Sequence, residues 1–463
     1  MRQRLCLWRR SARAAIVITI GAAAGVVSAA WSTAAAEPTN AEPSAVLDAT
    51  HLPPLLRVSG EMPTLAYDVH CAAEGEEEVD PGCDATGSVF VRSAGSGAFE
   101  ALPLSSGLIN GQRRLSVTVP DRFGESRRDF EYYAVLEASD LDRQIVLPAG
   151  GAAAPHVSRL LKGSVVVDLG LHDFDSERRE ADRVAFASWG DQSGQVGLEQ
   201  GRTPNPIGGS AFDVDERGGI VLLDQVHRRL LRWANGHGAP SSVPVSVNGT
   251  LADLALANDG SVFVLESTSP PGRNPMIRRF DDGGRELEAI ESAERTPSQI
   301  RVDERGPVIL ARPSHHWMPV LVDGVPASPR HQLERGRAGR RVGRERELVV
   351  LRHANEIRIA DVAGDVVTRS WRVTSGTPLA EVQLADAWGQ RLLVVARVYN
   401  DVRDEFAVLV LDRDGLVESF TMDSADWAEA APLGRFERVG RSLYRLGSSP
   451  AGVFVDRFEL GVR

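Results

Sequence analysis

Several histidines and carboxylates lie in short stretches C-terminal to residue 220 of this 463-residue chain. Imidazole nitrogens and carboxylate oxygens are common ligands of Zn²⁺ and Ca²⁺, and a bound divalent ion can polarise a carbonyl or activate water. The candidate ligands are His227, His315, His316, His353, Asp401, Asp404 and Glu405. Two hypotheses follow, a metal-dependent enzyme or a set of polar connecting loops.

The loop hypothesis has the simpler physical basis. Connecting loops are polar in any case, and neighbours such as His315 and His316 cannot both face one way in an extended segment. The sequence has no G-x-S-x-G, H-E-x-x-H or phosphate-binding glycine loop. It does not identify a nucleophile, a base and an electrophile together, so the catalytic residues, if any, stay unknown.

The segments that carry these residues repeat. Phe212 to Asp224 aligns without a gap to Leu254 to Glu266 and to Ile300 to Arg312. Each copy alternates apolar and polar residues, turns at a glycine and ends in a short apolar run, which predicts a β-hairpin. These turns and two weaker copies place repeat glycines at Gly218, Gly260, Gly306, Gly389 and Gly440.

A second series of turns, mostly Asn-Gly and Asp-Gly pairs, follows further alternating strands and gives four strands per repeat. Repeats of roughly 40 to 50 residues with four strands are typical of β-propeller blades, and about six fit between residue 164 and the C-terminus. The last repeat lacks a fourth strand. A strand from the start of the domain, either Val184 to Trp189 or Val165 to Leu169, is expected to close the ring.

The stretch from Trp189 to Trp233 resembles an NHL-type repeat. Asp224 and Arg229 match the pattern, while His227 stands where the family usually has asparagine. The resemblance is strong over this repeat, fair over the next two and faint from residue 330 onward. It implies a six-bladed propeller in which Asp224 and Arg229 tie a loop to its neighbours. It implies little about function, because propellers host enzymes and scaffolds alike.

Residues 52–150 contain short segments that alternate apolar and polar residues without the repeat seen later in the chain. This pattern predicts a small β-sandwich of immunoglobulin or fibronectin type. We expect a flexible linker at 37–51 and another at 151–163, where residues 156–161 could form a short turn of helix. Six short alternating segments carry this prediction, Leu65 to Cys71, Gly87 to Arg92, Ala98 to Leu102, Leu115 to Val119, Phe130 to Ala138 and Gln144 to Leu147.

The first 36 residues are predicted to be an export signal. Five arginines precede an apolar run from Ala14 to Trp31, and small residues follow it. An uncleaved anchor is the alternative; nothing else in the sequence suggests a membrane span. In an oxidising compartment, Cys71 and Cys83 are expected to form a disulfide, with a metal pair as the weaker alternative. We therefore expect a secreted or periplasmic protein.

Charge limits the possible partners. The chain has a formal net charge of −11, and removing the five signal arginines leaves 47 basic against 63 acidic residues, or −16. This balance disfavours nucleic acid as a partner. The basic stretch from Arg330 to Arg346 is interpreted as a solvated loop rather than a polyanion site.

These observations predict an all-β protein, a sandwich followed by a six-bladed propeller of four-stranded blades. The expected function is non-enzymatic binding or scaffolding, with a protein, peptide or glycan held on the face that carries the longer connections, where the candidate ligands lie. No cofactor is expected. The alternative is a propeller lyase or lactonase that uses Ca²⁺ or Zn²⁺.

Overall fold

The computed structural model describes residues 46–461, except for residues 73–83, 96, 110–111, 125–127, 177, 201–204, 235–237, 248–251, 267–273, 295, 312–314, 344 and 429–433. The expected signal segment at 1–36 lies outside these residues. The part from Ser44 to Arg463 forms one compact unit. Nearly all of its regular structure is strand, and no described helix has the length and apolar character that a membrane crossing needs.

Two N-terminal sheets share one hydrophobic core. The first has the order β1-β3-β7-β6, and the second has the order β2-β10-β8-β4-β5 with β9 beside β8. Alternation along β8 places Phe130, Tyr132, Ala134 and Leu136 in the core with almost no exposed surface. The strands are β1 (Val46–His51), β2 (Leu56–Arg57), β3 (Thr64–Ala72), β4 (Ala85–Ser93), β5 (Glu100–Pro103), β6 (Ser105–Ile109), β7 (Gln112–Thr118), β8 (Phe130–Ala138), β9 (Arg143–Leu147) and β10 (His156–Leu160). Two short helices, α1 (Asp121–Gly124) and η1 (Gly151–Ala153), connect them.

Two segments expected to be linkers contain strands instead. β1 begins at Val46, inside the expected linker 37–51, because Leu47, Ala49 and His51 alternate into the core. The expected helical turn at 156–161 is strand β10, whose residues His156, Ser158 and Leu160 are buried in alternation. β10 pairs with both β2 and β8, so these three strands hydrogen-bond as neighbours in one sheet.

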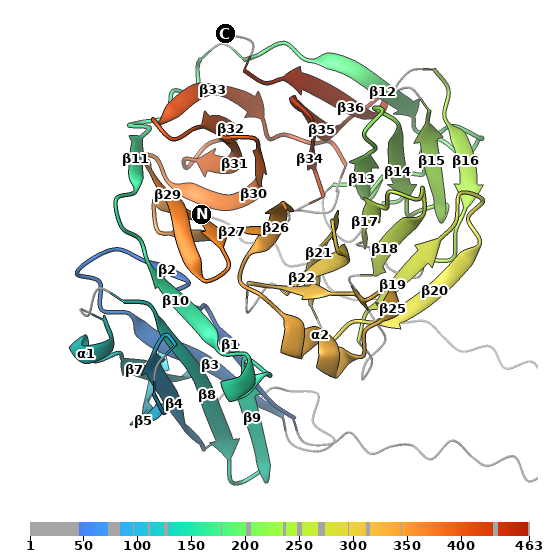
Figure 1. Ribbon diagram of the computed structural model, residues 1–463. Coiled ribbons are helices and arrows are strands. Elements are labelled where there is room, and N and C mark those ends of the chain that lie inside the picture. The colour runs from blue at the N-terminus through green and yellow to red at the C-terminus, as the bar shows by residue number, and fades with distance from the viewer. Residues whose placement is uncertain are drawn as a thin grey trace, which may run out of the picture. The chain divides into compact units, whose positions relative to one another are not determined.

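Six further sheets of three or more strands follow among the described residues, and Figure 1 shows them side by side around a common centre, as in a β-propeller. The first sheet has β13 (Ala211–Val214), β14 (Ile220–Asp224), β15 (Arg229–Trp233) and β16 (Ser241–Pro244), and the second has β17 (Ala252–Leu256), β18 (Val262–Glu266), β19 (Met276–Phe280) and β20 (Glu286–Glu291). The third has β21 (Pro297–Asp303), β22 (Gly306–Ala311) and β23 (His316–Pro319). The fourth has β26 (Arg340–Gly343), β27 (Arg346–His353), β28 (Glu356–Ala363) and β29 (Val366–Thr374). The fifth has β30 (Leu379–Trp388), β31 (Arg391–Tyr399), β32 (Asp404–Leu411) and β33 (Leu416–Asp423), and the sixth has β34 (Phe436–Val439), β35 (Ser442–Ser449) and β36 (Gly452–Glu459).

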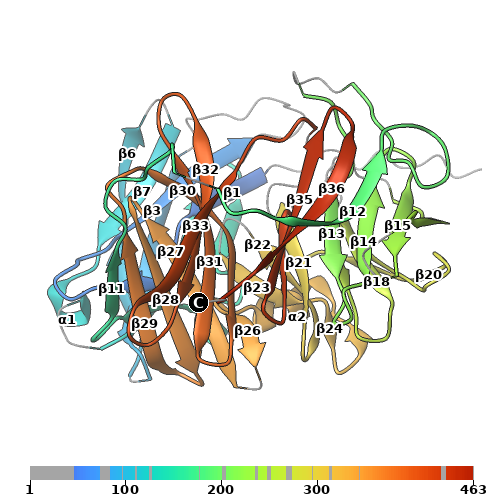
Figure 2. The same ribbon diagram turned by 90° about the horizontal axis from the view of Figure 1, so that it is seen from above.

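A strand from the start of the domain completes the sixth sheet. β12 (Asp182–Ser188) pairs antiparallel with β36, from Asp182 opposite Arg457 to Ser188 opposite Gly452. Figures 1 and 2 both show β12 beside β36. The other segment considered for this role, β11 (Val165–Asp168), pairs in parallel with β29 and extends the fourth sheet to five strands. The two ends of the domain are thereby joined in one sheet.

The third sheet departs from the expected four strands. After β23, the Asp323-Gly324 turn joins two strands of two residues, β24 (Leu321–Val322) and β25 (Val325–Pro326), which pair only with each other. Helix α2 (Pro329–Arg335) follows, and the side chain of Ser328 caps it by accepting a hydrogen bond from His331 N. Pro319, Pro326 and Pro329 cannot donate to a ladder, which disfavours a fourth strand here.

Part of the basic stretch from Arg330 to Arg346 is therefore regular structure, not the solvated loop that we expected. It contributes most of α2 and all of β26. Several of its arginines form ion pairs, including Arg340 with Asp386 at 2.8 Å and Arg337 with Glu347 at 2.9 Å.

The N-terminal sheets contact the third and fourth propeller sheets directly. Arg358 on β28, which is 3% exposed, donates hydrogen bonds to Leu56 O at 3.0 Å and to Glu61 Oε2 at 2.6 Å. On β23, His316 Nε2 lies 3.1 Å from His156 Nδ1 of β10. A small apolar cluster, formed by Leu55, Leu56 and Leu161 with Val349, Ala360 and Val362, fills the rest of the contact.

Candidate functional site

The predicted metal ligand His227 forms a hydrogen bond within its own repeat. Asp224, fully buried, accepts hydrogen bonds from His227 Nδ1 at 2.8 Å and from Arg229 Nε at 2.9 Å. It also accepts one from the backbone N–H of Gly197, and Arg229 Nη2 donates to Gln195 O at 2.6 Å. These bonds tie the loop at 190–197 to the β14–β15 connection, which is the role that the NHL resemblance implies for Asp224 and Arg229.

The other three predicted histidines have different surroundings. His316 is 8% exposed and faces His156 across the contact with the N-terminal sheets. His315 has a positive φ of 52° just before β23 and lines a hollow. His353 is exposed at the end of β27. Adjacent in sequence, His315 and His316 therefore point to different surroundings.

Two of the predicted carboxylates, Glu405 and Asp404, form hydrogen bonds or ion pairs with other side chains. Glu405 is 2% exposed and accepts hydrogen bonds from His172 Nε2 and Arg178 Nη2, both at 3.0 Å. Asp404 pairs with Arg397, while Asp401 lies in the exposed turn between β31 and β32. In the part of the chain that the structure describes, no group of three or more His, Cys, Asp or Glu residues is placed to hold a metal ion. The seven candidate ligands are not brought together.

The five repeat glycines occupy the first hairpin of their sheets, and all have positive φ. Gly218, Gly260, Gly389 and Gly440 lie in the turn itself, and Gly306 begins β22. The predicted disulfide partner Cys83 lies outside the described residues, while Cys71 is buried at 2% exposure in β3. The Cys71–Cys83 pairing stays a prediction.

Charged residues fill the centre of the propeller, near the turns that join the first two strands of each sheet. Arg301 of β21, 6% exposed, lies 3.2 Å from Asp253 Oδ2 and 2.8 Å from Glu437 Oε1. Asp386 pairs at 2.8 Å with both Arg340 and Arg438. Burial raises the pKa values of Asp253 and Glu437, although Arg301 opposes this effect. Since these residues come from inner strands of different sheets, the network holds the ring together.

A hollow of about 620 Å³ lies on the other side of Arg301 and Arg340, between the third, fourth and fifth sheets. We call it the long-connection groove, because His315 and Tyr399 at its margin border the β22–β23 and β31–β32 connections. This volume is in the range of small-ligand sites, roughly 300–1,000 Å³. Its lining is largely apolar and includes Leu310, Trp317, Leu348, Val350, Leu351, Leu379, Val382 and Leu384.

One wall of the groove is a strand with half of one edge unpaired. β26 is only four residues long and pairs with β27 no further than Arg340 opposite Leu348. β27 continues to His353, paired along its length with β28 on its other side. Among the described residues, Val349–His353 has no strand partner on the β26 side. In the first, second, third and fifth sheets the innermost strand pairs with most of its neighbour. In the sixth sheet, β34 pairs only with Ser442–Arg445 of β35.

The opposite wall is irregular and carries an unsatisfied polar atom. The pairing of β30 with β31 shifts register between Leu379 and Val382 and again between Val382 and Leu384. Gln383, on this irregular part of β30, is 7% exposed, and its Oε1 has no hydrogen-bond partner among the described residues. Leaving a buried acceptor unmet costs about 1–3 kcal/mol, so such an atom indicates a missing partner.

Sequence reasoning missed Trp317, Val350 and Gln383 as site residues. Gln383 carries no distinct signal, because it stands at a polar position of the alternating segment Ala380 to Leu384. The open edge of β27 carries none, since it depends on where β26 ends.

Comparisons with known proteins show distant structural likenesses only. No protein-family model matches the chain, and no curated protein is similar to it in sequence. A solved protein of unknown function from Bacteroides thetaiotaomicron matches with 7% identity over 91% of this chain and 98% of its own, with a TM-score of 0.32. Virginiamycin B lyase from Staphylococcus aureus matches with 10% identity over 54% of this chain and 95% of its own, with a TM-score of 0.31. YCF48 bound to D1 peptide matches with 10% identity over 65% and 99%, with a TM-score of 0.29. Likeness at this level does not reveal what this chain binds.

Proposed function

We propose that this chain is an exported, non-enzymatic binding protein that holds an extended peptide in the long-connection groove. In this proposal the six consecutive sheets are the six blades of an NHL-like propeller, and the two N-terminal sheets are an immunoglobulin-like sandwich. Export rests on the arginines and the apolar run of the first 36 residues. A secreted or periplasmic location follows from the same segment.

The observation that carries the proposal is the unpaired edge of β27. A strand edge presents a row of backbone N–H and C=O groups, and an extended peptide can satisfy them as an added strand. Within residues 349–353, Val350, Leu351 and Arg352 line the hollow, so part of this edge faces it. An added strand at this place would take the inner position that β26 leaves vacant beyond Leu348.

The lining of the groove sets the chemistry of the peptide. Side chains of an added strand alternate between two faces, so every second residue would meet apolar groups such as Val350, Leu379 and Val382. Gln383 Oε1 would accept a hydrogen bond from a backbone or side-chain N–H of the peptide. The preferred ligand is therefore a short peptide that alternates apolar with polar residues.

The test uses a library of alternating five-residue peptides and isothermal titration calorimetry of the hits. In a hit, methylating single backbone nitrogens should weaken binding at least about tenfold at alternate positions, because each lost N–H breaks one ladder bond, and little at the positions between. Equal effects at all positions, or no hit at all, would contradict strand addition.

A variant of the protein gives the matching result. Ala380 is half-buried in the groove wall, and Ala380→Trp should fill the hollow and abolish binding of the hit peptides. Ala451→Trp makes the same change at an exposed turn outside the groove and should leave binding unaltered. Equal thermal stability of the two variants, followed by circular dichroism, separates lost binding from lost folding.

A further inference from the structure

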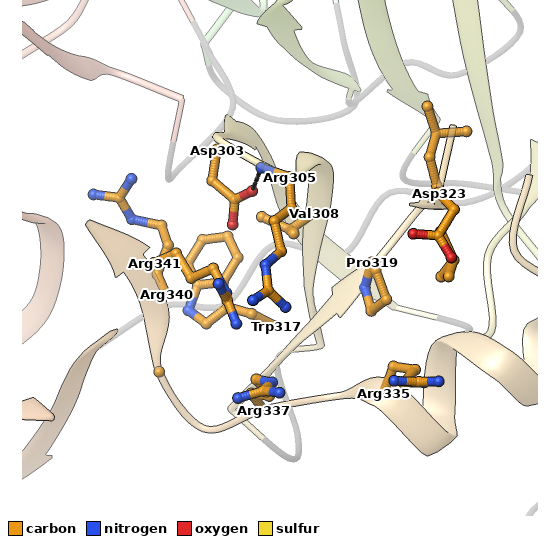
Figure 3. Close-up of a pocket in the computed structure, with 13 residues that line it drawn as sticks. Asp303, Arg305, Val308, Trp317, Pro319, Asp323, Arg335, Arg337, Arg340 and Arg341 are labelled. Atoms are coloured by element: carbon orange, nitrogen blue, oxygen red, sulfur yellow. Dashed lines mark hydrogen bonds between the residues drawn. The ribbon is translucent and has the colours of Figure 1, made fainter. Parts of the chain in front are cut away.

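A second hollow lies between the third and fourth sheets, bounded by the β21–β22 turn, β23, β24 and the segment from α2 to β26 (Figure 3). Its volume is about 410 Å³. It shares Trp317 and Arg340 with the long-connection groove, but the rest of its lining is different. We call it the arginine pocket, because five arginines line it, Arg305, Arg335, Arg337, Arg340 and Arg341.

The positive charges of this pocket are not fully matched. Arg337 and Arg341 share one carboxylate, Glu347, at 2.9 Å and 3.8 Å. The charge of Arg340 is met by Asp386, which Arg438 also uses. Asp303 lies near enough to Arg305, and Glu334 near enough to Arg335, for these charges to interact, although neither pair is among the close ion pairs of the described residues. The lining thus carries five arginines against two carboxylates, Asp303 and Asp323, in a chain whose overall formal charge is −11.

The repulsion within the cluster also affects protonation. Burial lowers the pKa of Arg341 and the nearby charges of Arg305 and Arg337 lower it further, whereas Glu347 and Asp303 each raise it by a smaller amount. A solvated surface arginine would not feel this repulsion, because water and salt screen exposed charges. A bound anion would relieve it, which gives the pocket a preference for negative charge.

The remaining lining points to more than a bare anion. Trp317 offers an indole ring, and Val308 and Pro319 add apolar surface beside it. Asp303 and Asp323 supply carboxylate oxygens, which accept hydrogen bonds from hydroxyl groups. Asp303 already accepts one bond from Arg305 N at 2.8 Å, which fixes the β21–β22 turn that carries both residues. The pocket therefore combines donors for an anion, a flat apolar face and acceptors for hydroxyls.

We propose that the arginine pocket binds an acidic sugar unit, with the anionic group on Arg305 and its neighbouring arginines and the ring against Trp317. Arginine suits this role because its planar fork of donors matches a carboxylate, sulfate or phosphate with two parallel hydrogen bonds. The proposal goes beyond the peptide-binding function and does not depend on it, since Arg305 and Arg335 line this pocket and not the groove.

The test is isothermal titration calorimetry at low ionic strength with four probes that share one ring. Galacturonate, galactose 6-sulfate and galactose 6-phosphate carry a charge, and galactose does not. At least one charged probe should bind at least about tenfold more tightly than galactose, and added salt should weaken it. Equal affinity for galactose, or no binding of any charged probe, would overturn the proposal. A bare sulfate ion that binds as tightly as the best sugar would overturn the role of the ring.

Variants identify the site. Arg305→Gln and Arg335→Gln should each weaken the best charged probe about fivefold or more, because each removes a guanidinium from the lining. Arg330→Gln is the matched control. It removes the same charge from the same helix as Arg335, but Arg330 is exposed, pairs with Glu334 and is not part of the lining. An equal loss in Arg330→Gln would show that only the net charge matters and would overturn the site. Hit peptides should still bind all three variants, which separates this proposal from the peptide groove.

Discussion

The second and third sheets of the propeller start alike and end differently. Their first two strands come from segments that align without a gap, Leu254 to Glu266 and Ile300 to Arg312. The second sheet continues through β19 and β20 to four strands, whereas the third stops at β23 and gives way to a hairpin and helix α2. The shared motif thus specifies a hairpin, and the residues after it decide whether a full sheet forms.

The difference has consequences for binding. In the second sheet, Arg278 on β19 pairs with Glu266 at 2.7 Å and with Glu286 on β20 at 2.9 Å, so three strands are joined by charge as well as by the ladder. The third sheet has no such strand to cover β23. Trp317, on β23, lines both the long-connection groove and the arginine pocket. Departures from a regular pattern are where functional sites are expected, because regular packing leaves little room for a ligand.

Removing one large side chain from the second sheet and one from the third should give the largest difference between the two sheets. Phe263 of the second sheet is 1% exposed in a closely packed cluster, so Phe263→Ala should lower the free energy of unfolding by about 3–5 kcal/mol. Trp317 is only half-buried, and Trp317→Ala should cost less than half as much while abolishing binding of both the peptide hits and the acidic sugar probe. Urea unfolding and calorimetry measure the two quantities.

The opposite ranking of stabilities would show that the third sheet is as essential to the ring as the second. Retained binding in Trp317→Ala would remove this residue from both sites.

A second contrast concerns one position on the third strand of the second and third sheets. In the second sheet, Ile277 pairs with Leu265, and the corresponding place in the third sheet holds His316, paired with Ala311. His316 belongs to a buried series with His156 and His51, which contact one another by hydrogen bond or ring packing. His51 Nδ1 donates to Ala66 O, so Nε2 accepts from Tyr132 OH. His51 also stacks on Tyr67, and His315 lies near enough to disfavour charge on His316.

Burial lowers the pKa values of His51 and His316 to about 4 and that of His156 well below its usual range. The unfolded chain binds protons at these sites near pH 6.5, and the folded chain does not until about pH 4, so the free energy of unfolding falls as pH decreases between these values. The loss amounts to about 3 kcal/mol for a histidine shifted this far. His316→Gln should therefore reduce the slope of the free energy of unfolding against pH, by an amount that corresponds to at most one bound proton.

Urea unfolding between pH 7 and pH 4 measures this slope. Comparing the variant with the natural chain cancels other titrating groups, such as Glu294, whose pKa burial raises to about 7. His331→Gln, at an exposed position on α2, should leave the slope unchanged. A slope in His316→Gln identical to that of the natural chain would mean that His316 binds the same number of protons in the folded and the unfolded chain.

Local patterns predicted what depends on local chemistry. The six N-terminal strands, the first-hairpin glycines and the strand from the start of the domain that pairs with β36 all follow from alternation and turn residues. The short β26, the pairing of β10 with β2 and the His156–His316 contact depend on how distant segments meet, which one sequence does not reveal. The candidate ligands failed to converge for the same reason. His227 and Glu405 satisfy partners that only the fold brings near, Asp191 in one case and His172 in the other.

The smallest expected effect compares the turns of the two sheets. Gly260 and Gly324 both have positive φ, 84° and 76°, so replacing either with alanine strains the backbone by about 1 kcal/mol. A Cβ on Gly260 would also lie 3.1 Å from Asp282 Oδ1, whereas one on Gly324 would meet nothing within 4 Å. Gly260→Ala should therefore lower the free energy of global unfolding by at least about 1 kcal/mol. Gly324→Ala should leave it almost unchanged, because β24 and β25 pair only with each other and can open without the ring. Hydrogen exchange should instead show faster local opening of Leu321–Pro326. Equal losses of global stability would mean that this hairpin unfolds together with the propeller, and that the third sheet is more complete than its strand count indicates.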